Sequence, residues 1–158
     1  MSDAQSFLRH AVATVAYRAG KSLRDVPDGF PDFSAFGGTR TPRQIVAHIN
    51  DLFDWALHLA DGQQVWNSSA PLEWDAEVAR FFDVVSRFDA RLASSAPLGS
   101  PPERLFQGPV ADALTHVGQL AMLRRMAGGP MRGENYFGAG IQAGRVGRDQ
   151  AAPVFEFD

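Results

Sequence analysis

Apolar residues recur at helical spacing in four stretches of the chain. Side chains three and four positions apart lie on one face of a helix, and this pattern covers residues 3–24, 42–61, 74–92 and 109–127. No stretch alternates apolar and polar residues as a half-buried strand would. The pattern predicts an all-α fold, an up-down four-helix bundle, in a single domain over residues 1–158.

Capping residues mark where these helices begin and end. Thr41 followed by Pro42, with Gln44 three positions after Thr41, is typical of a helix that starts with a capping box. Gly62 is expected to end that helix. Pro109 suits the first position of the last predicted helix, which is expected to end before a Gly-Gly-Pro sequence.

Two irregular segments carry many aromatic residues. Residues 25–40 hold two prolines, three glycines and three phenylalanines, so they form a connection that serves either as a functional loop or as a lid over the apolar core. Residues 128–158 contain seven glycines, which disfavours a fifth long helix and predicts an irregular C-terminal tail. The tail is expected to dock on the bundle through Tyr136, Phe137, Ile141, Val154, Phe155 and Phe157.

The last predicted helix combines a carboxylate with an imidazole. Asp112 and His116 lie one turn apart, and Gln119 falls within roughly 60° of both around the helix axis. Apolar residues cover the neighbouring side, so this helix is expected to be mostly buried. A buried carboxylate needs a cation, a hydrogen-bond donor or a metal ion. The sequence therefore predicts a partner for Asp112.

Of the other three histidines, only His48 is placed to meet that helix. It lies at the margin of the apolar face of its own helix, whereas His10 and His58 fall on polar faces. Asp112 and His116 can chelate one ion from a single helix face, and His48 can complete a three-ligand set with open coordination positions. The prediction is a divalent-metal site formed by His48, Asp112 and His116. The alternative is a metal-free network in which Asp112 accepts hydrogen bonds from the histidines.

Composition narrows the chemistry further. The chain has no cysteine, which excludes disulfides and thiolate ligands, so any metal must be held by nitrogen and oxygen atoms. The net charge of −3 comes without a cluster of basic residues, so nucleic-acid binding is not expected. No apolar run is long enough to span a bilayer, and the first residues lack a signal-peptide pattern. These features predict a cytoplasmic protein that does not enter a membrane.

Two motifs resemble those of the DinB/YfiT-like family of four-helix-bundle proteins. They are TPRQIVAHINDLFDWAL in the second predicted helix and DALTHVGQLAMLRR in the fourth, and the resemblance extends over about residues 1–127. The family carries one histidine on the second helix and an H-x-x-x-H pair on the fourth. His48 matches the helix-two histidine, His116 matches the second histidine of the pair, and Asp112 occupies the position of the first. The resemblance thus implies two histidines and one carboxylate, a set that suits zinc, nickel, manganese or iron(II).

The resemblance also implies a function. Members of this family include transferases that use low-molecular-weight thiols, and others are hydrolases. A metal-dependent enzyme acting on a small molecule or a low-molecular-weight thiol is therefore expected, and the alternative is a non-catalytic metal-binding protein of stress response or interaction. The catalytic residues are not identified by the sequence. Candidates for a general base are Asp51, Asp54, Glu134 and Tyr136. The aromatic irregular segments favour a homodimer.

Overall fold

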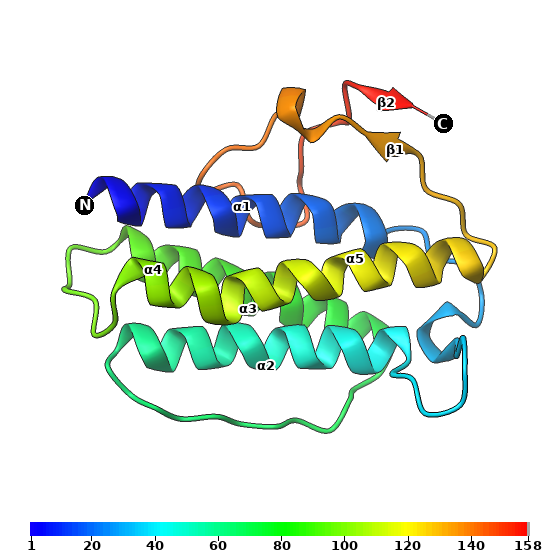
Figure 1. Cartoon of the computed structure of the whole chain (residues 1–158), viewed down its shortest axis with the longest axis horizontal. Helices are drawn as coiled ribbons and strands as arrows, with labels where there is room; N and C mark the ends of the chain where they lie inside the picture. The colour runs from blue at the N-terminus through cyan, green and yellow to red at the C-terminus, as the bar shows by residue number, and fades with distance from the viewer. Residues whose placement is uncertain (158) are drawn as a thin grey trace.

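The computed structural model describes residues 1–157 and has an all-α architecture, as the apolar periodicity predicts (Figure 1). Its four long helices are α1 (Asp3–Leu23), α2 (Pro42–Ala60), α3 (Trp74–Ala93) and α5 (Ala111–Met126). The short elements are the 3₁₀ turns η1 (Phe30–Asp32) and η3 (Tyr136–Gly138), the helix α4 (Pro102–Leu105), the π-helical turn η2 (Phe106–Val110), and the strands β1 (Gly133–Glu134) and β2 (Glu156–Phe157).

Helix α2 begins with the capping box that its sequence predicts. The Thr41 hydroxyl accepts a hydrogen bond from the backbone N–H of Gln44, and the Gln44 side chain accepts one from the N–H of Thr41. These bonds satisfy backbone donors that an uncapped helix would leave free. The helix is followed by Gly62, whose φ of 78° lies in the left-handed region that favours glycine. The cap fixes the start of the helix that carries His48.

Helices α2 and α3 run in the same direction, because contacts between them advance together along both helices. The pairs are Arg43 with Glu73, Asn50 with Glu77, and Asp61 with Arg91. Helices α1 and α5 also run parallel to each other and opposite to α2 and α3 (Figure 1). The simple up-down order expected from the sequence therefore differs from the observed connectivity, in which the second and third helices point the same way.

The long connection between α2 and α3 explains this difference. Residues 61–73 run as an extended segment along the whole bundle, from the end of α2 back to the level of its start (Figure 1). A chain of that length can reach about 43 Å, whereas a helix of 19 residues is only about 28 Å long. The connection therefore returns the chain to the starting end before α3 begins.

The four long helices enclose a continuous apolar core. Its centre contains three phenylalanine rings, with Phe53 of α2 lying 6.4 Å from Phe81 and 5.9 Å from Phe88 of α3 between ring centroids. All three side chains are fully buried, and such large aromatic side chains dominate the apolar area that a core removes from water. Within the described residues, no helix combines the length and the apolarity needed to cross a membrane.

The last helical segment starts earlier than its sequence predicts. We expected Pro109 at the first helical position, but the helical path already begins at Pro102 and passes through the π-helical turn η2, which contains Pro109. Proline has no N–H to donate and its ring crowds the preceding turn of an α-helix. The π-helical turn, which inserts one extra residue, accommodates Pro109 within the continuous helical path. Helix α5 follows this turn directly and presents Asp112 in its first turn.

The C-terminal tail is anchored to α1 by buried polar contacts. Lys21 Nζ lies 3.0 Å from Glu134 Oε2 and 2.7 Å from Glu156 Oε1, and the Tyr17 hydroxyl donates to Glu134 Oε1 at 2.6 Å. Glu134 and Glu156 sit opposite each other in the antiparallel pair formed by β1 and β2. One lysine of α1 therefore fastens both strands of the tail.

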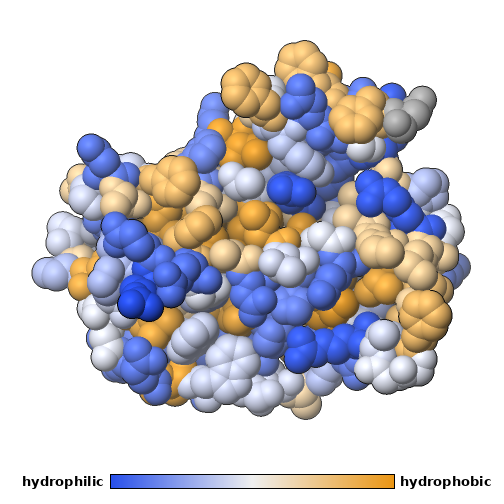
Figure 2. All heavy atoms as spheres, viewed as in Figure 1, coloured by the Kyte–Doolittle hydropathy of each residue, from blue (hydrophilic) through white to orange (hydrophobic). Residues whose placement is uncertain are grey.

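Several aromatic side chains of the tail do not dock as expected. Phe137 is fully exposed, and the side chains of Val154, Phe155 and Phe157 are more than half exposed; Figure 2 shows apolar side chains gathered on the outer side of this end of the molecule. Tyr136, by contrast, packs edge-on against Tyr17, and Ile141 lies against the core. The expectation of docking is wrong for Phe137, Val154, Phe155 and Phe157, because ion pairs rather than these side chains attach the tail.

Candidate metal centre

His48, Asp112 and His116 meet where α2 passes α5. The two helices run antiparallel, and because the helical path into α5 already begins at Pro102, the second turn of α2 lies beside the first two turns of α5. His48 Nε2 lies 3.9 Å from Asp112 Oδ2, and His116 Nε2 lies 3.5 Å from Asp112 Oδ1. One ligand atom from each of the three residues falls within 4.8 Å of the others. The structure thus brings together the three residues that the sequence singles out.

The spacing of these atoms fits a single ion. Zinc bonds to nitrogen and oxygen of about 2.0 to 2.1 Å in a tetrahedral site place neighbouring ligand atoms about 3.3 Å apart. His48 and His116 lie about 0.6 and 0.2 Å beyond that value from two different oxygens of Asp112, and one atom from each of the three residues falls within 4.8 Å of the others. The two imidazole rings are perpendicular, with centroids 4.7 Å apart, and each faces a different carboxylate oxygen. Small side-chain rotations would close this set around one cation.

Gln119 orients the ring of His116. The amide oxygen of Gln119 lies 2.8 Å from His116 Nδ1. That oxygen can only accept a hydrogen bond, so Nδ1 must carry the proton and donate it. In neutral His116 the lone pair then lies on Nε2, the nitrogen that faces Asp112. Such a hydrogen bond behind a ligating histidine is a regular feature of metal sites.

His48 is also held in its neutral form. Burial lowers the pKa of His48, and the charges of Arg40 and His116 lower it further, while Asp112 and Asp51 act in the opposite direction with smaller effect. A lowered pKa keeps the imidazole unprotonated at neutral pH, and only an unprotonated nitrogen can bind a metal. The lowered pKa therefore leaves His48 able to act as a metal ligand at neutral pH.

Asp112 itself is more accessible than its sequence context predicts. Its side chain is 49% exposed, because it lies in the first turn of α5, where the helix emerges from η2. Only a narrow stripe of α5 is buried, so the expectation of a mostly buried helix with a buried carboxylate is wrong. A solvated Asp112 has no need of a partner. The case for a metal rests on the geometry of the three side chains, and the exposure leaves room for a further ligand.

An aromatic wall stands beside His48. The ring of Trp66 lies 5.8 Å from the imidazole of His48, and Trp55 of α2 lies 5.9 Å from Trp66. Trp66 belongs to the extended connection between α2 and α3. This connection therefore contributes to the site as well as setting the topology.

The connection is held against the bundle by buried acids. Asp51 accepts hydrogen bonds from the backbone N–H of Ser69 and from Arg80, at 2.9 and 2.6 Å. Glu77 accepts one from the backbone N–H of Leu72 at 2.8 Å. Because these acids are buried and hydrogen-bonded, the wall next to His48 has a defined position.

Arg40 lines two cavities, one next to His116 and the other next to His48. A cavity of about 330 Å³ lies between Arg40 and His116, and its walls include Ile45, Gln119 and Leu123. A second cavity of about 260 Å³ lies on the other side, bounded by Arg40 and His48. Arg40, the last residue of the segment 25–40, thus places the end of this connection beside the site. The expectation of a lid over the core holds in part, because Phe30 is buried against Trp74 while Phe36 is exposed. A functional role of this segment stays a prediction.

The remaining histidines lie elsewhere. His10 is exposed on α1, and His58 contacts Asp54 and Gln63 near the end of α2. The group of potential metal ligands found in the described residues contains neither of them.

The four residues considered as a general base are engaged in other contacts. Asp51 binds Ser69 and Arg80, and Asp54 accepts a hydrogen bond from Asn67. Glu134 is bound by Tyr17 and Lys21, and Tyr136 packs on Tyr17 with the Arg18 guanidinium over its ring. None of these contacts directs a side chain to the metal centre. The sequence could not reveal these contacts, because each joins segments that are distant along the chain.

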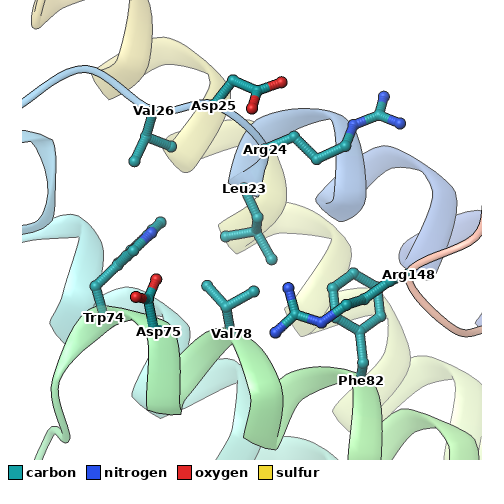
Figure 3. A pocket seen from close by; sticks show the side chains of 9 residues that line it. All are labelled: Leu23, Arg24, Asp25, Val26, Trp74, Asp75, Val78, Phe82 and Arg148. Atoms are coloured by element: carbon teal, nitrogen blue, oxygen red, sulfur yellow. The ribbon is translucent and has the colours of Figure 1, made fainter.

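A separate hollow lies at the end of α1, away from the metal centre (Figure 3). Its volume is about 480 Å³, and its floor is formed by Leu23, Val78 and Phe82. Two arginines and two aspartates share its rim, so their charges balance. None of the three potential ligands lines it. The lining residues labelled in Figure 3 are Leu23, Arg24, Asp25, Val26, Trp74, Asp75, Val78, Phe82 and Arg148.

Arg40 and Trp66 lie beside the site, and neither could be assigned to it from the sequence. Both lie in connections, where no helical periodicity indicates which way a side chain points. Gln119 could be placed from its three-residue spacing to His116. Comparison of the chain with protein-family models, with curated proteins and with solved structures finds no match.

Proposed function

We propose that His48, Asp112 and His116 bind one divalent metal ion. The observation that carries this proposal is the convergence of two imidazole nitrogens and a carboxylate oxygen from two helices within 4.8 Å of one another. The neutral state of His48 and the orientation of His116 by Gln119 support it further. Nitrogen and oxygen ligands in this ratio suit zinc, nickel, manganese or iron(II).

We further propose that the protein is a metal-dependent enzyme of the thiol-transferase or hydrolase type. Three protein ligands leave coordination positions open, which is typical of a catalytic rather than a structural site. A metal ion in such a site lowers the pKa of a bound water or thiol and so supplies a nucleophile at neutral pH. The exposure of Asp112 gives a small molecule access to the open side.

The chain's own residues would orient the reactants. Gln119 holds the ring of His116, and Trp66 covers one side of His48, which limits the approach of water from that direction. Arg40 supplies a positive charge between the two cavities. On the motifs of α2 and α5, we place the chain with the DinB/YfiT-like family, and we expect a homodimer and a small-molecule or low-molecular-weight thiol substrate.

A non-catalytic metal-binding protein is the second candidate. It is favoured by the hydrogen bonds of Asp51, Asp54 and Glu134 and by the ring contacts of Tyr136, which hold all four candidate general bases in other interactions. Such a protein would bind the ion without turning over a substrate.

Turnover by the zinc-loaded protein separates the two candidates. Low-molecular-weight thiols should be offered together with electrophilic acceptors, and simple esters and amides offered in parallel. The enzyme proposal predicts turnover that is abolished by chelator and by Asp112→Ala. Stoichiometric zinc binding without turnover of any of these substrates would favour the non-catalytic protein.

A further inference from the structure

Arg40 is an unpaired cation at the edge of the metal centre. It lies directly before the capping box of α2 and is exposed. Arg43, three residues later, forms ion pairs with Asp32 and Glu73. Among residues 1–157, by contrast, Arg40 has no hydrogen bond or ion pair, although its charge is felt by His48. An unpaired guanidinium beside a cavity is available to a ligand.

The cavity next to Arg40 combines apolar walls with a few polar groups. Ile45 and Leu123 form apolar walls, and Met122 adds a flexible side chain at the mouth. His116 and the exposed Gln119 also line this cavity. The Gln119 oxygen is bound to His116, which leaves its amide nitrogen without a partner in the described part of the chain. A volume of about 330 Å³ suits a small organic molecule.

We propose that this cavity binds a small organic carboxylate, whose acid group pairs with Arg40 and whose apolar body packs on Ile45, Met122 and Leu123 beside the metal centre. A carboxylate matches the planar fork of a guanidinium and can accept two parallel hydrogen bonds from it. The Gln119 amide nitrogen offers one more hydrogen-bond donor to a ligand in this cavity. The cavity thus selects an anionic, partly apolar ligand.

This inference rests on the proposed function in one respect only, namely whether a metal ion is bound beside the cavity. Without a metal ion, the negative charge of Asp112 opposes an anion, and Arg40 provides the attraction. With a divalent ion bound, the charge of Asp112 is more than neutralised. The carboxylate should therefore bind both forms through Arg40, and bind the metal-loaded form more tightly.

Calorimetric titration with 3-phenylpropionate tests the proposal, with the neutral 3-phenylpropanamide as the matched ligand. Both should be titrated into metal-free and zinc-loaded protein. The variant is Arg40→Gln, and the control is Arg104→Gln, which removes an exposed arginine of α4. Arg40→Gln should weaken binding of the acid roughly tenfold in both forms. Arg104→Gln should leave the affinity unchanged, and the amide should bind wild type as weakly as the acid binds Arg40→Gln.

Each of the following results would overturn the proposal. They are equal affinities of wild type and Arg40→Gln for the acid, equal affinities of wild type for acid and amide, and no binding of the acid to either form at about 10 mM ligand. Binding that requires zinc and ignores Arg40 also overturns it, because the carboxylate would then ligate the ion. Zinc titration of the same preparations tests the proposed function separately. Failure to bind zinc would leave an Arg40-dependent site in the metal-free protein intact.

Discussion

His48 Nε2 on α2 lies 3.9 Å from Asp112 Oδ2 on α5, while the other oxygen of Asp112 lies 3.5 Å from His116 Nε2. One carboxylate therefore stands between two imidazoles from different helices. At these distances the three side chains are too far apart for direct hydrogen bonds, so they do not satisfy one another. One ligand atom from each of the three residues could bind a single cation placed among them.

Substitution of Asp112 tests whether it is a ligand. Asp112→Ala should weaken zinc binding by at least about 100-fold, since it removes both a ligand and a negative charge. Asp112→His should retain the ion, because imidazole at this position restores a three-histidine set. In the metal-free proteins the free energy of unfolding should change by less than about 0.5 kcal/mol, because the side chain is half exposed. Competition titration with a zinc chelator and urea unfolding measure both quantities. Loss of stability without loss of zinc affinity in Asp112→Ala would contradict the assignment.

Gln119 offers a test of the orientation of His116. Gln119→Ala should weaken zinc binding about tenfold, because the hydrogen bond that holds Nδ1 is lost and the ring is free to turn. The matched control is Gln63→Ala, which removes a glutamine contact to Nδ1 of His58 at 3.2 Å. The control should bind zinc as wild type does. If both variants bind zinc equally well, the hydrogen bond from His116 has no role in the site.

The buried glutamate of the tail should be important for stability. Glu134→Ala leaves the Tyr17 hydroxyl without its buried acceptor and Lys21 with Glu156 as its one remaining partner, which should lower the free energy of unfolding by about 1 to 3 kcal/mol. Glu103→Ala, at an exposed acid of α4, should have little effect. Burial and the hydrogen bond to Glu134 also raise the pKa of Tyr17, so its ultraviolet titration should move to lower pH in Glu134→Ala. An unchanged tyrosine titration together with unchanged stability would show that the tail is not anchored this way.

Glu156 should make part of the stability depend on acid pH. Its hydrogen bond with Lys21 holds the pKa of Glu156 below its ordinary value in the folded protein. A lowered folded pKa stabilises the protein above the unfolded value of 4.5, and this contribution is lost as the pH falls through the folded value. Urea midpoints of Glu156→Gln and wild type should therefore differ at pH 7 and converge as the pH falls below the folded pKa of Glu156. If the difference between the two urea midpoints persists or grows at acid pH, Glu156 does not stabilise the protein in its ionised form.

Local features of the fold are predictable where the interacting residues are close in the sequence. The capping box joins Thr41 to Gln44, and the pairs formed by His116 with Asp112 and Gln119 are fixed by helical geometry once α5 forms. His48 could be added because its position on the margin of an apolar face directs it to a neighbouring helix. These inferences need only the period of the helix.

Features that depend on connections could not be predicted in the same way. The parallel run of α2 and α3 follows from the path of residues 61–73, which has no periodic pattern, and the helical start at Pro102 depends on a π turn that no local residue preference marks. The exposure of Phe137 reflects an anchor between Lys21 and Glu134, which are more than a hundred residues apart. Tertiary contacts of this kind decide which apolar side chains are buried, and the amino-acid composition of a segment does not reveal them.

The metal content of the purified protein decides whether His48, Asp112 and His116 bind an ion. Elemental analysis with a zinc titration should be made on wild type, on His48→Ala and His116→Ala, and on His58→Ala as the matched control from the same helix as His48. The proposed site predicts one bound ion per chain in wild type and in His58→Ala, and loss of that ion in His48→Ala and His116→Ala. Chelator should lower the melting temperature only of the proteins that bind the ion. No bound metal in wild type, no uptake on titration and no effect of chelator on the melting temperature would contradict it.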